Sequence, residues 1–338
     1  MTSKTSTRIV VLAPNWLGDA VMALPAIRDV RRHFSGAELS VGARPAVAAL
    51  FQAVPGIDEI VTLTNKNARQ ALRGDVGILF PNSFRSAWLM KRAGVKERWG
   101  YRADCRSVLL TKSVKRPRHK VHFGEYYQNL VRELGIETGP LTPQIAVPPA
   151  RIEAAAKLLH ARGWDPAQPL VGLAPGAAFG HAKRWPPERF AALANALAAG
   201  PGAACVLLGR DEDRDAGNRI EVPGIVNLIG HTDLLMLMGV LSHCRALVAN
   251  DSGALHLAAA LGIPVTAIYG PTDERYSLPL TSSGSAHDRV SAIFHPVFCR
   301  PCGLRDCPID HRCMKGIATE RVFDSVRQQL RLGTEVRL

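Results

Sequence analysis

The stretch A-L-V-A-N-D-S-G-A-L-H-L-A-A-A-L-G-I-P, residues 246–264, contains the pattern that decides the fold. A short apolar run, Ala246–Ala249, precedes a polar turn, and a second apolar run then continues to the helix breaker Pro264. This order predicts a buried strand, a tight turn and a helix. A strand that leads directly into a helix is the repeating unit of parallel α/β sheets, so the stretch favours that fold class.

The turn at the start of this predicted helix is suited to an anion. Asp251 or Ser252 can cap the helix, and Gly253 lets a ligand come close. The first N–H groups of a helix have no partner within it and point outward. We therefore expect a diphosphate here, while an ordinary N-cap is the alternative from these residues alone.

Strands and helices alternate along the rest of the chain. Apolar runs typical of buried parallel strands occur at 8–13, 39–41, 60–61, 76–80, 170–174, 204–208, 246–249 and 265–269. Helical spacing or composition occurs at 21–34, 47–53, 151–162, 187–199, 213–220, 233–241, 253–261 and 321–330. The alternation predicts doubly wound parallel sheets with helices on both faces.

The chain divides near its middle. Residues 139–150 contain four prolines and resemble an inter-domain linker, and V-V-L-A-P-N at 10–15 is echoed by V-G-L-A-P-G at 171–176. We expect two Rossmann-like domains, 1–150 and 151–320, facing a cleft, and a C-terminal helix and tail, 321–338, that crosses back to the first domain. Ligands of such sheets bind at the carboxyl ends of the strands.

Composition limits the possible functions. The chain has 338 residues, a net charge of +13 and seven cysteines. No apolar run is long enough to span a membrane or to form a signal sequence, and an odd cysteine number suits a reducing compartment, so we expect a cytoplasmic protein. Residues 1–150 carry 22 Lys and Arg against 11 Asp and Glu, and within 85–120 the numbers are 12 against two. The first half therefore favours an anionic partner such as an acidic lipid, a membrane surface or nucleic acid, although a solvated basic surface is the alternative.

Four strings in collinear order carry a resemblance to a known family. They are P-N-W-L-G-D-A at 14–20, P-N-S-F-R-S-A at 81–87, P-G-A-A-F-G-H-A-K-R-W-P at 175–186 and N-D-S-G-A-L-H at 250–256. Together they resemble the lipopolysaccharide heptosyltransferases, which are family 9 glycosyltransferases of GT-B fold. The resemblance extends from about Arg8 to Val326. The second and third strings are most similar to the heptosyltransferase II branch, which adds the second inner-core heptose.

The resemblance implies an inverting, metal-independent reaction without a cofactor. Heptose would pass from ADP-L-glycero-β-D-manno-heptose to heptosyl-Kdo₂-lipid A, an anionic lipid, at the cytoplasmic face of the inner membrane. A phosphate-rich acceptor agrees with the basic first half. We expect closure of the two domains over the donor to assemble the site.

The two catalytic candidates differ in charge. By resemblance, Asp19 is the general base that takes the proton of the acceptor hydroxyl, and an ordinary aspartate is ionised at pH 7. Lys183 is the candidate that stabilises negative charge on the departing β-phosphate. The alternatives from the residues alone are an N-cap for Asp19 and a surface lysine for Lys183, with Arg184 as a neighbouring candidate.

Donor-binding candidates follow several predicted strands. Backbone N–H groups and Ser252 would hold the phosphates, Gly253 belongs to the same turn, and Asp251 would hold sugar hydroxyls or orient the turn. Thr232 matches a family position near adenine. His256 lies four residues after Ser252 on the same helix face, and an acidic residue at the end of 209–213, with Asp213 as the candidate, could hydrogen-bond the ribose. His256 is otherwise a buried structural histidine, and Asp211, Glu212 and Asp213 cannot be separated by sequence.

Acceptor-binding candidates lie in the basic first half. They are Asn82, Ser83, Arg85, Arg98 and Arg102, and the planar fork of arginine suits phosphates and carboxylates. Cys299, Cys302, Cys307 and Cys313 have ligand types for a structural Zn²⁺, but their spacing is looser than paired C-x₂-C units, and we expect no metal.

Two rival functions use the same observations. The first is heptosyltransferase I or another core-sugar transferase of the same family. The second is a basic nucleic-acid-binding protein with a zinc module. We expect no nucleic-acid partner, since the basic segment has few interleaved aromatic residues and no recognisable nucleic-acid motif.

Overall fold

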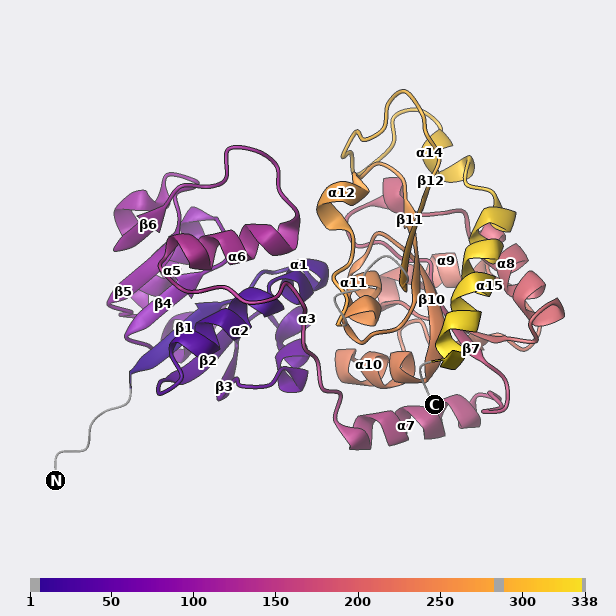
Figure 1. Cartoon of the computed structure of the whole chain (residues 1–338), viewed down its shortest axis with the longest axis horizontal. Helices are drawn as coiled ribbons and strands as arrows, with labels where there is room; N and C mark the ends of the chain where they lie inside the picture. The colour runs from indigo at the N-terminus through magenta and orange to yellow at the C-terminus, as the bar shows by residue number, and fades with distance from the viewer. Residues whose placement is uncertain (1–6, 283–288, 336–338) are drawn as a thin grey trace. The chain divides into compact units, whose positions relative to one another are not determined.

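Two six-stranded parallel sheets with the same strand order form the cores of the chain (Figure 1). The computed structural model describes residues 7–282 and 289–335. The chain divides into two units, Met1–Ala146 and Val147–Leu338.

The first unit has the strand order β3-β2-β1-β4-β5-β6. Its strands are β1 (Arg8–Leu12), β2 (Glu38–Ala43), β3 (Glu59–Thr62), β4 (Val76–Leu79), β5 (Glu97–Tyr101) and β6 (Lys112–Val114). Its helices are α1 (Leu17–Met22), α2 (Leu24–His33), α3 (Pro45–Ala48), α4 (Ala68–Ala71), α5 (Phe84–Arg92) and α6 (Phe123–Glu133), with 3₁₀ turns η1 (Ala49–Ala53) and η2 (Arg106–Leu109).

The second unit has the strand order β12-β11-β10-β7-β8-β9. Its strands are β7 (Leu170–Ala174), β8 (Ala204–Leu207), β9 (Val226–Asn227), β10 (Cys244–Asn250), β11 (Val265–Tyr269) and β12 (Val290–Phe294). Its helices are α7 (Pro149–Ala161), α8 (Pro187–Ala199), α9 (Arg214–Asn218), α10 (Leu234–His243), α11 (Gly253–Ala260), α12 (Glu274–Ser277), α14 (Arg312–Lys315) and α15 (Thr319–Glu335), with 3₁₀ turns η3 (His181–Lys183) and η4 (Asp211–Asp213).

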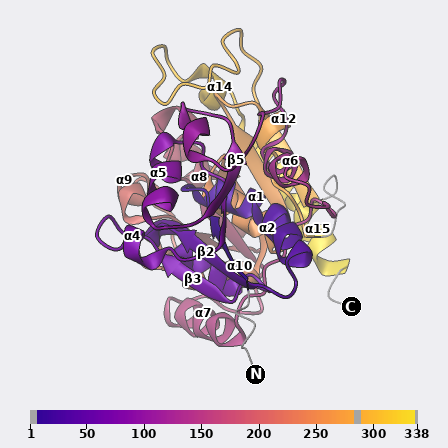
Figure 2. The same ribbon diagram turned by 90° about the vertical axis from the view of Figure 1, so that its left-hand side faces the viewer.

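Helices cover both faces of each sheet, which confirms the predicted fold class. In the first unit, α4 and α5 pack together on one face, and α1, α2 and α6 pack together on the other (Figure 2). In the second unit, α8 and α15 cover one face, whereas α7, α10 and α11 pack together on the other. The central strands β1, β7 and β10 read as continuous apolar runs because they are buried on both faces.

Some elements differ from their predictions. The predicted helix 21–34 is two helices, α1 and α2, because Pro25 in the first turn of α2 has no N–H to continue the α1 ladder. Strand β5, with the sequence E-R-W-G-Y, was not predicted, since it is partly exposed and lacks an apolar run.

The predicted linker 139–150 is largely built into the first unit. Gly139 N–H donates to Asp29 at 3.0 Å, and Ala146 N–H donates to the Ala53 carbonyl at 2.7 Å. The division between the units therefore falls at Ala146, and α7 begins at Pro149. The prolines stiffen an extended segment, and since they have no N–H, the backbone donors of this segment are other residues.

The C-terminal helix α15 is part of the second unit, and the expectation that it crosses back to the first domain stays a prediction. It packs on α8, β10 and β11, with Val322 and Val326 fully buried. Gln329 donates to the Val265 carbonyl at 2.7 Å. These contacts bury the apolar face of α15. The sequence reveals that this face is apolar but not which elements it packs against. Residues 336–338 of the predicted tail lie outside the described residues.

Among residues 7–282 and 289–335, no helix has both the length and the apolar character needed to cross a membrane.

Candidate active site

Each sheet has one place where its strand order reverses, and the two predicted catalytic residues follow strands that border it. The chain runs outward from β1 to β3 and then returns to place β4 on the other side of β1. In the same way β10 lies on the other side of β7. Because helices leave in opposite directions at such a switch point, the carboxyl ends of the two strands form a crevice that binds ligands. Asp19 follows β1, and Lys183 follows β7.

A buried asparagine joins the two turns of the second switch point. Asn250, the last residue of β10, has no solvent exposure. Its amide donates to the Pro175 carbonyl at 2.7 Å and accepts from Trp185 N–H at 3.1 Å. It therefore holds both ends of the loop that carries Lys183. Sequence reasoning missed this role, although a polar residue at the end of an apolar strand was a usable signal.

Lys183 and Asp251 form the central ion pair of the second unit. Lys183 Nζ lies 2.6 Å from Asp251 Oδ2, and the side chains are only 12% and 6% exposed. The Thr272 hydroxyl donates to the same carboxylate oxygen at 2.7 Å, and His256 Nε2 lies 3.9 Å from the other oxygen. The structure thus brings three predicted residues together and adds Thr272, which sequence analysis missed because it follows a different strand, β11.

The acidity of Asp251 follows from these neighbours. Burial alone would raise the pKa of this carboxyl, but His256 and the Lys183 ammonium outweigh burial and hold the pKa well below its usual range. A carboxylate cannot attract phosphate directly. Its position therefore favours orientation of the Lys183 ammonium.

The pair predicts a pH dependence of stability. Because the pKa of Asp251 is lower in the folded protein, its contribution is present above the unfolded pKa of about 3.9 and is lost as pH falls below that value. We expect the difference in free energy of unfolding between wild type and Asp251→Asn to shrink as pH is lowered from about 6 towards 3. Urea unfolding of both proteins across this pH range measures the difference in free energy of unfolding. A difference that does not change with pH would contradict the prediction.

The anion site was predicted at the start of α11. Ser252 is the N-cap, with extended backbone and no capping bond from its side chain. Ser252 Oγ and His256 Nδ1 are buried, and neither has a hydrogen-bond partner among the described residues. Buried polar atoms without partners are uncommon and often await a ligand or water. The first turn of α11 therefore offers N–H groups and a free hydroxyl beside Lys183.

The structure separates the three acidic residues after β8. Asp213 is buried and lies 3.2 Å from Arg184 Nη2, whereas Asp211 and Glu212 are exposed and pair with Arg214 and Arg210. A Cβ at Gly176 would lie 2.2 Å from Asp213 Oδ2, so glycine leaves room for this carboxylate beside the turn after β7. Asp213 is therefore the one of the three that reaches the second switch point, through Arg184.

Thr232 lies farther along the same edge of the sheet. It is half-buried in the segment between β9 and α10. The next residue, Asp233, caps α10 by accepting from Met236 N–H at 2.7 Å. A role at adenine stays a prediction from the resemblance.

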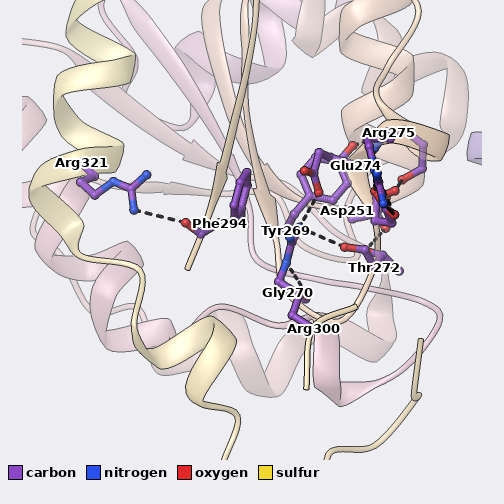
Figure 3. Close-up of polar contacts among 11 residues, drawn as sticks. Asp251, Tyr269, Gly270, Thr272, Glu274, Arg275, Phe294, Arg300 and Arg321 are labelled. Atoms are coloured by element: carbon purple, nitrogen blue, oxygen red, sulfur yellow. Dashed lines mark hydrogen bonds and ion pairs between the residues drawn. The ribbon is translucent and has the colours of Figure 1, made fainter. Parts of the chain in front are cut away.

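An arginine in the cysteine-containing segment supports Thr272 (Figure 3). Arg300 donates to the carbonyls of Gly270 at 2.9 Å and Thr272 at 3.1 Å, and lies 2.5 Å from Glu274 Oε2. Its guanidinium also lies 4.2 Å from the centre of the Phe294 ring. These contacts hold the turn after β11, and that turn holds Asp251.

Arg300→Ala is expected to destabilise the second unit by about 3 kcal/mol, because it leaves Glu274 and two carbonyls without their buried partner. Arg275→Ala is the matched control, since Arg275 lies 2.6 Å from Asp273 in the same turn but is 73% exposed. The Arg275 guanidinium lies in water, although Asp273 is only 14% exposed, and surface ion pairs contribute less than about 1 kcal/mol. Chemical denaturation of both variants measures the difference, and equal losses would refute the supporting role of Arg300.

Asp19 lies at the switch point of the first unit. It occupies the first turn of α1 and is half-buried. The Tyr127 hydroxyl of α6 donates to Asp19 Oδ1 at 3.3 Å. Burial, together with the Asp19 charge, raises the pKa of Tyr127 well above its ordinary value, so the phenol keeps its proton and acts as a donor. Asp19 is thus positioned by a residue 108 positions away in the sequence.

The β4 turn contains three acceptor candidates in different roles. Asn82 donates to the Tyr126 hydroxyl at 2.8 Å, next to Tyr127 on α6. Ser83 caps α5 by accepting from Ser86 N–H at 3.3 Å. Arg85 is exposed and donates to Asn65 at 3.1 Å. Asn82 therefore shares the Asp19 neighbourhood through α6, whereas the Ser83 side chain has a clear structural role.

A buried arginine that sequence analysis missed organises this turn. Arg106 is fully buried and donates to the Pro81 and Tyr101 carbonyls and to the Ser86 hydroxyl. Burial lowers the pKa of Arg106 to about 10, so it remains charged at neutral pH. Nothing local distinguishes it from its many basic neighbours, because its burial depends on the packing of η2 against α5.

The two remaining arginine candidates, Arg98 and Arg102, make hydrogen bonds within the first unit. Arg98 donates to the carbonyls of Leu109, Val95 and Lys96 at 2.6 to 2.7 Å. These bonds use its guanidinium to join β5 to its flanking loops. Arg102 is exposed and donates to the Ser113 hydroxyl at 3.1 Å. Acceptor binding by either residue stays a prediction.

The four C-terminal cysteines are free thiols. Cys313 is buried, and Cys307 Sγ accepts from His311 N–H at 3.3 Å. Within the described ranges, no three His, Cys, Asp or Glu side chains gather in a geometry that could hold a metal ion.

Comparison with known proteins identifies the family to which this chain belongs. Residues 66–293 match the family model described as glycosyltransferase family 9 (heptosyltransferase). The chain is 30% identical over 302 residues to lipooligosaccharide heptosyltransferase 2 of Haemophilus ducreyi, covering 81% of this chain and 86% of that protein. It is also 30% identical over 299 residues to lipopolysaccharide heptosyltransferase 2 of Escherichia coli K12, with coverages of 81% and 86%.

A solved structure gives the same result. The structure of E. coli ADP-heptose lipopolysaccharide heptosyltransferase II matches with a TM-score of 0.81 and 28% identity, covering 96% of this chain and 99% of that one. The fold is therefore that of a GT-B glycosyltransferase. The chain belongs to glycosyltransferase family 9, the heptosyltransferases. The resemblance drawn from the four sequence strings is confirmed.

Proposed function

We propose that this protein transfers heptose from ADP-L-glycero-β-D-manno-heptose to heptosyl-Kdo₂-lipid A during assembly of the lipopolysaccharide inner core. The observation that carries the proposal is the position of Asp19 and Lys183 at the switch points of the two sheets. The heptosyltransferase 2 names of the relatives at 30% identity support the choice of acceptor.

The donor side uses the second unit. The first turn of α11 and Ser252 would bind the diphosphate, and Lys183, oriented by Asp251, would stabilise charge on the departing β-phosphate. A buried ammonium and a helix N-terminus together supply positive charge at the leaving group. We therefore propose that the reaction needs no metal ion.

The acceptor side uses the first unit. Asp19 would take the proton from the attacking heptose hydroxyl, which then displaces ADP from the opposite side of the anomeric carbon and inverts its configuration. The basic segment 85–120 would attract the phosphates and carboxylates of the acceptor. A lipid acceptor implies peripheral association with the cytoplasmic face of the inner membrane.

The test is transfer of radiolabelled heptose from ADP-heptose to defined acceptors with EDTA present. We expect transfer to heptosyl-Kdo₂-lipid A and little transfer to Kdo₂-lipid A. Transfer only to Kdo₂-lipid A would replace the proposal with the heptosyltransferase I reaction. Loss of turnover in EDTA, restored by a divalent cation, would contradict the metal-independent mechanism.

A further inference from the structure

Helix α5 presents an exposed stripe that its own packing does not use. Phe84, Trp88, Lys91 and Arg92 are exposed, and their spacing places them on one face of the helix. The rings of Phe84 and Trp88 stack with their centroids 6.5 Å apart. The two residues are 42% and 44% exposed. The opposite face, with Ala87 and Met90, is buried in the core of the first unit.

A third exposed apolar residue lies on the neighbouring turn. Val108 in η2 is 83% exposed, and η2 packs against α5. Two bonds fasten this region to the start of α5, since Phe84 N–H donates to Asp104 Oδ2 at 2.6 Å and Arg106 donates to Ser86 at 3.1 Å. The residues Phe84, Trp88, Lys91, Arg92 and Val108 form what we call the α5 docking surface.

The segment that carries the α5 docking surface is strongly positive, with 12 Lys and Arg against two Asp and Glu in residues 85–120. Arg92 lies 6.0 Å from the centre of the Trp88 ring. Further exposed basic side chains of segment 85–120 are Arg85, Lys96, Arg102, Lys112, Lys115, Arg116, Arg118 and Lys120. The two acidic residues of the segment are both hydrogen-bonded, Asp104 to Phe84 N–H and Glu97 to the Thr111 hydroxyl at 2.8 Å.

We propose that the α5 docking surface binds the anionic surface of a lipid bilayer. Aromatic side chains are favoured at the membrane–water interface, and clustered lysine and arginine side chains are attracted to acidic headgroups. The exposed Val108 side chain adds apolar area to the surface. The inference rests on the proposed function in one respect, since a lipid acceptor would be presented at such a surface, but vesicle binding can be measured without heptose transfer.

The test is co-sedimentation of the full chain with vesicles of phosphatidylglycerol and phosphatidylcholine, compared with vesicles of phosphatidylcholine alone. We expect binding only to the acidic vesicles. Trp88→Ser with Val108→Ser should weaken it on the order of tenfold, and Lys91→Glu with Arg92→Glu by at least about tenfold, with loss of binding in high salt.

Phe298→Ser is the matched control. Phe298 is 81% exposed, and Arg312 lies 5.3 Å from the centre of its ring, so it is a similar aromatic and arginine pair on the second unit. It should leave vesicle binding unchanged. All the substituted side chains are exposed, and equal thermal unfolding temperatures would show that the variants fold.

The outcomes separate this inference from the proposed function. Three results would overturn the α5 docking surface. They are a loss of vesicle binding in Phe298→Ser equal to that in the α5 variants, no binding of the wild-type protein to acidic vesicles, and tighter binding of the wild-type protein to DNA than to these vesicles at the same salt concentration. Trp88→Ser with Val108→Ser should keep turnover on detergent-dispersed acceptor and lose it on acceptor in vesicles. Absence of heptose transfer with vesicle binding intact would refute the proposed reaction and leave the docking surface standing.

Discussion

Replacing Asp19 with asparagine is expected to lower kcat by about 10²- to 10⁴-fold, the contribution typical of a positioned general base. Asparagine keeps the shape of the side chain and an oxygen that can accept the bond from Tyr127. Affinity for ADP should stay near that of wild type, because the proposed donor residues belong to the second unit. Initial rates with radiolabelled donor and calorimetric titration with ADP measure the two quantities.

Tyr127→Phe is the control for the Asp19 variant. It removes the hydroxyl that donates to Asp19 and leaves the carboxylate in place. We expect a much smaller loss of kcat than in Asp19→Asn. Near-normal turnover of Asp19→Asn would rule out Asp19 as the base, and equal losses in the two variants would indicate that the hydrogen bond itself is what matters.

Lys183→Met is expected to reduce kcat/KM by about 10²- to 10³-fold through loss of charge stabilisation at the leaving phosphate. The same change leaves Asp251 buried without its cation, which costs about 3 to 5 kcal/mol of stability. Activity and unfolding must therefore be measured together. A loss confined to KM would contradict the leaving-group role.

Two further variants separate catalysis from folding. Lys183→Met combined with Asp251→Asn removes both charges, so stability should recover while turnover does not. Lys157→Met is the matched control, since Lys157 lies 2.7 Å from Glu153 but both side chains are largely exposed. It should change neither property by more than about 1 kcal/mol. Recovery of turnover in the double variant would show that Lys183 acts only through stability.

Much of the candidate site could be predicted because of a general property of parallel α/β sheets. Strands buried on both faces are continuous apolar runs, and turns that follow them carry the polar groups. Asp19, Lys183 and Asp251 were therefore assigned to strand ends from local pattern and family resemblance, and the structure has them at those ends. Their catalytic roles remain predictions for the variants above to test.

Arg106, Asn250 and Thr272 show what local pattern could not provide. Each is an ordinary polar residue in its own segment, and its role arises from carbonyls or side chains distant in sequence. Arg98 is another case, because its Nε and Nη1 groups donate to backbone carbonyls, which its basic neighbourhood did not indicate, and acceptor binding by this residue stays a prediction. Charge counts do not reveal which side chains packing will bury.

The sequence by itself determined the α/β class, the two sheets and the strand ends near which the candidate reactive groups lie, because apolar periodicity and turn residues report local burial. The family came separately, from the resemblance carried by the four motif strings. Only the tertiary structure decided that Asp251 pairs with Lys183, that Asp213 rather than Asp211 or Glu212 reaches Arg184, that Tyr127 contacts Asp19, and that α15 packs within the second unit. These outcomes depend on strand order and on the paths of loops, which bring side chains together across long separations in the chain. No local pattern contains that information.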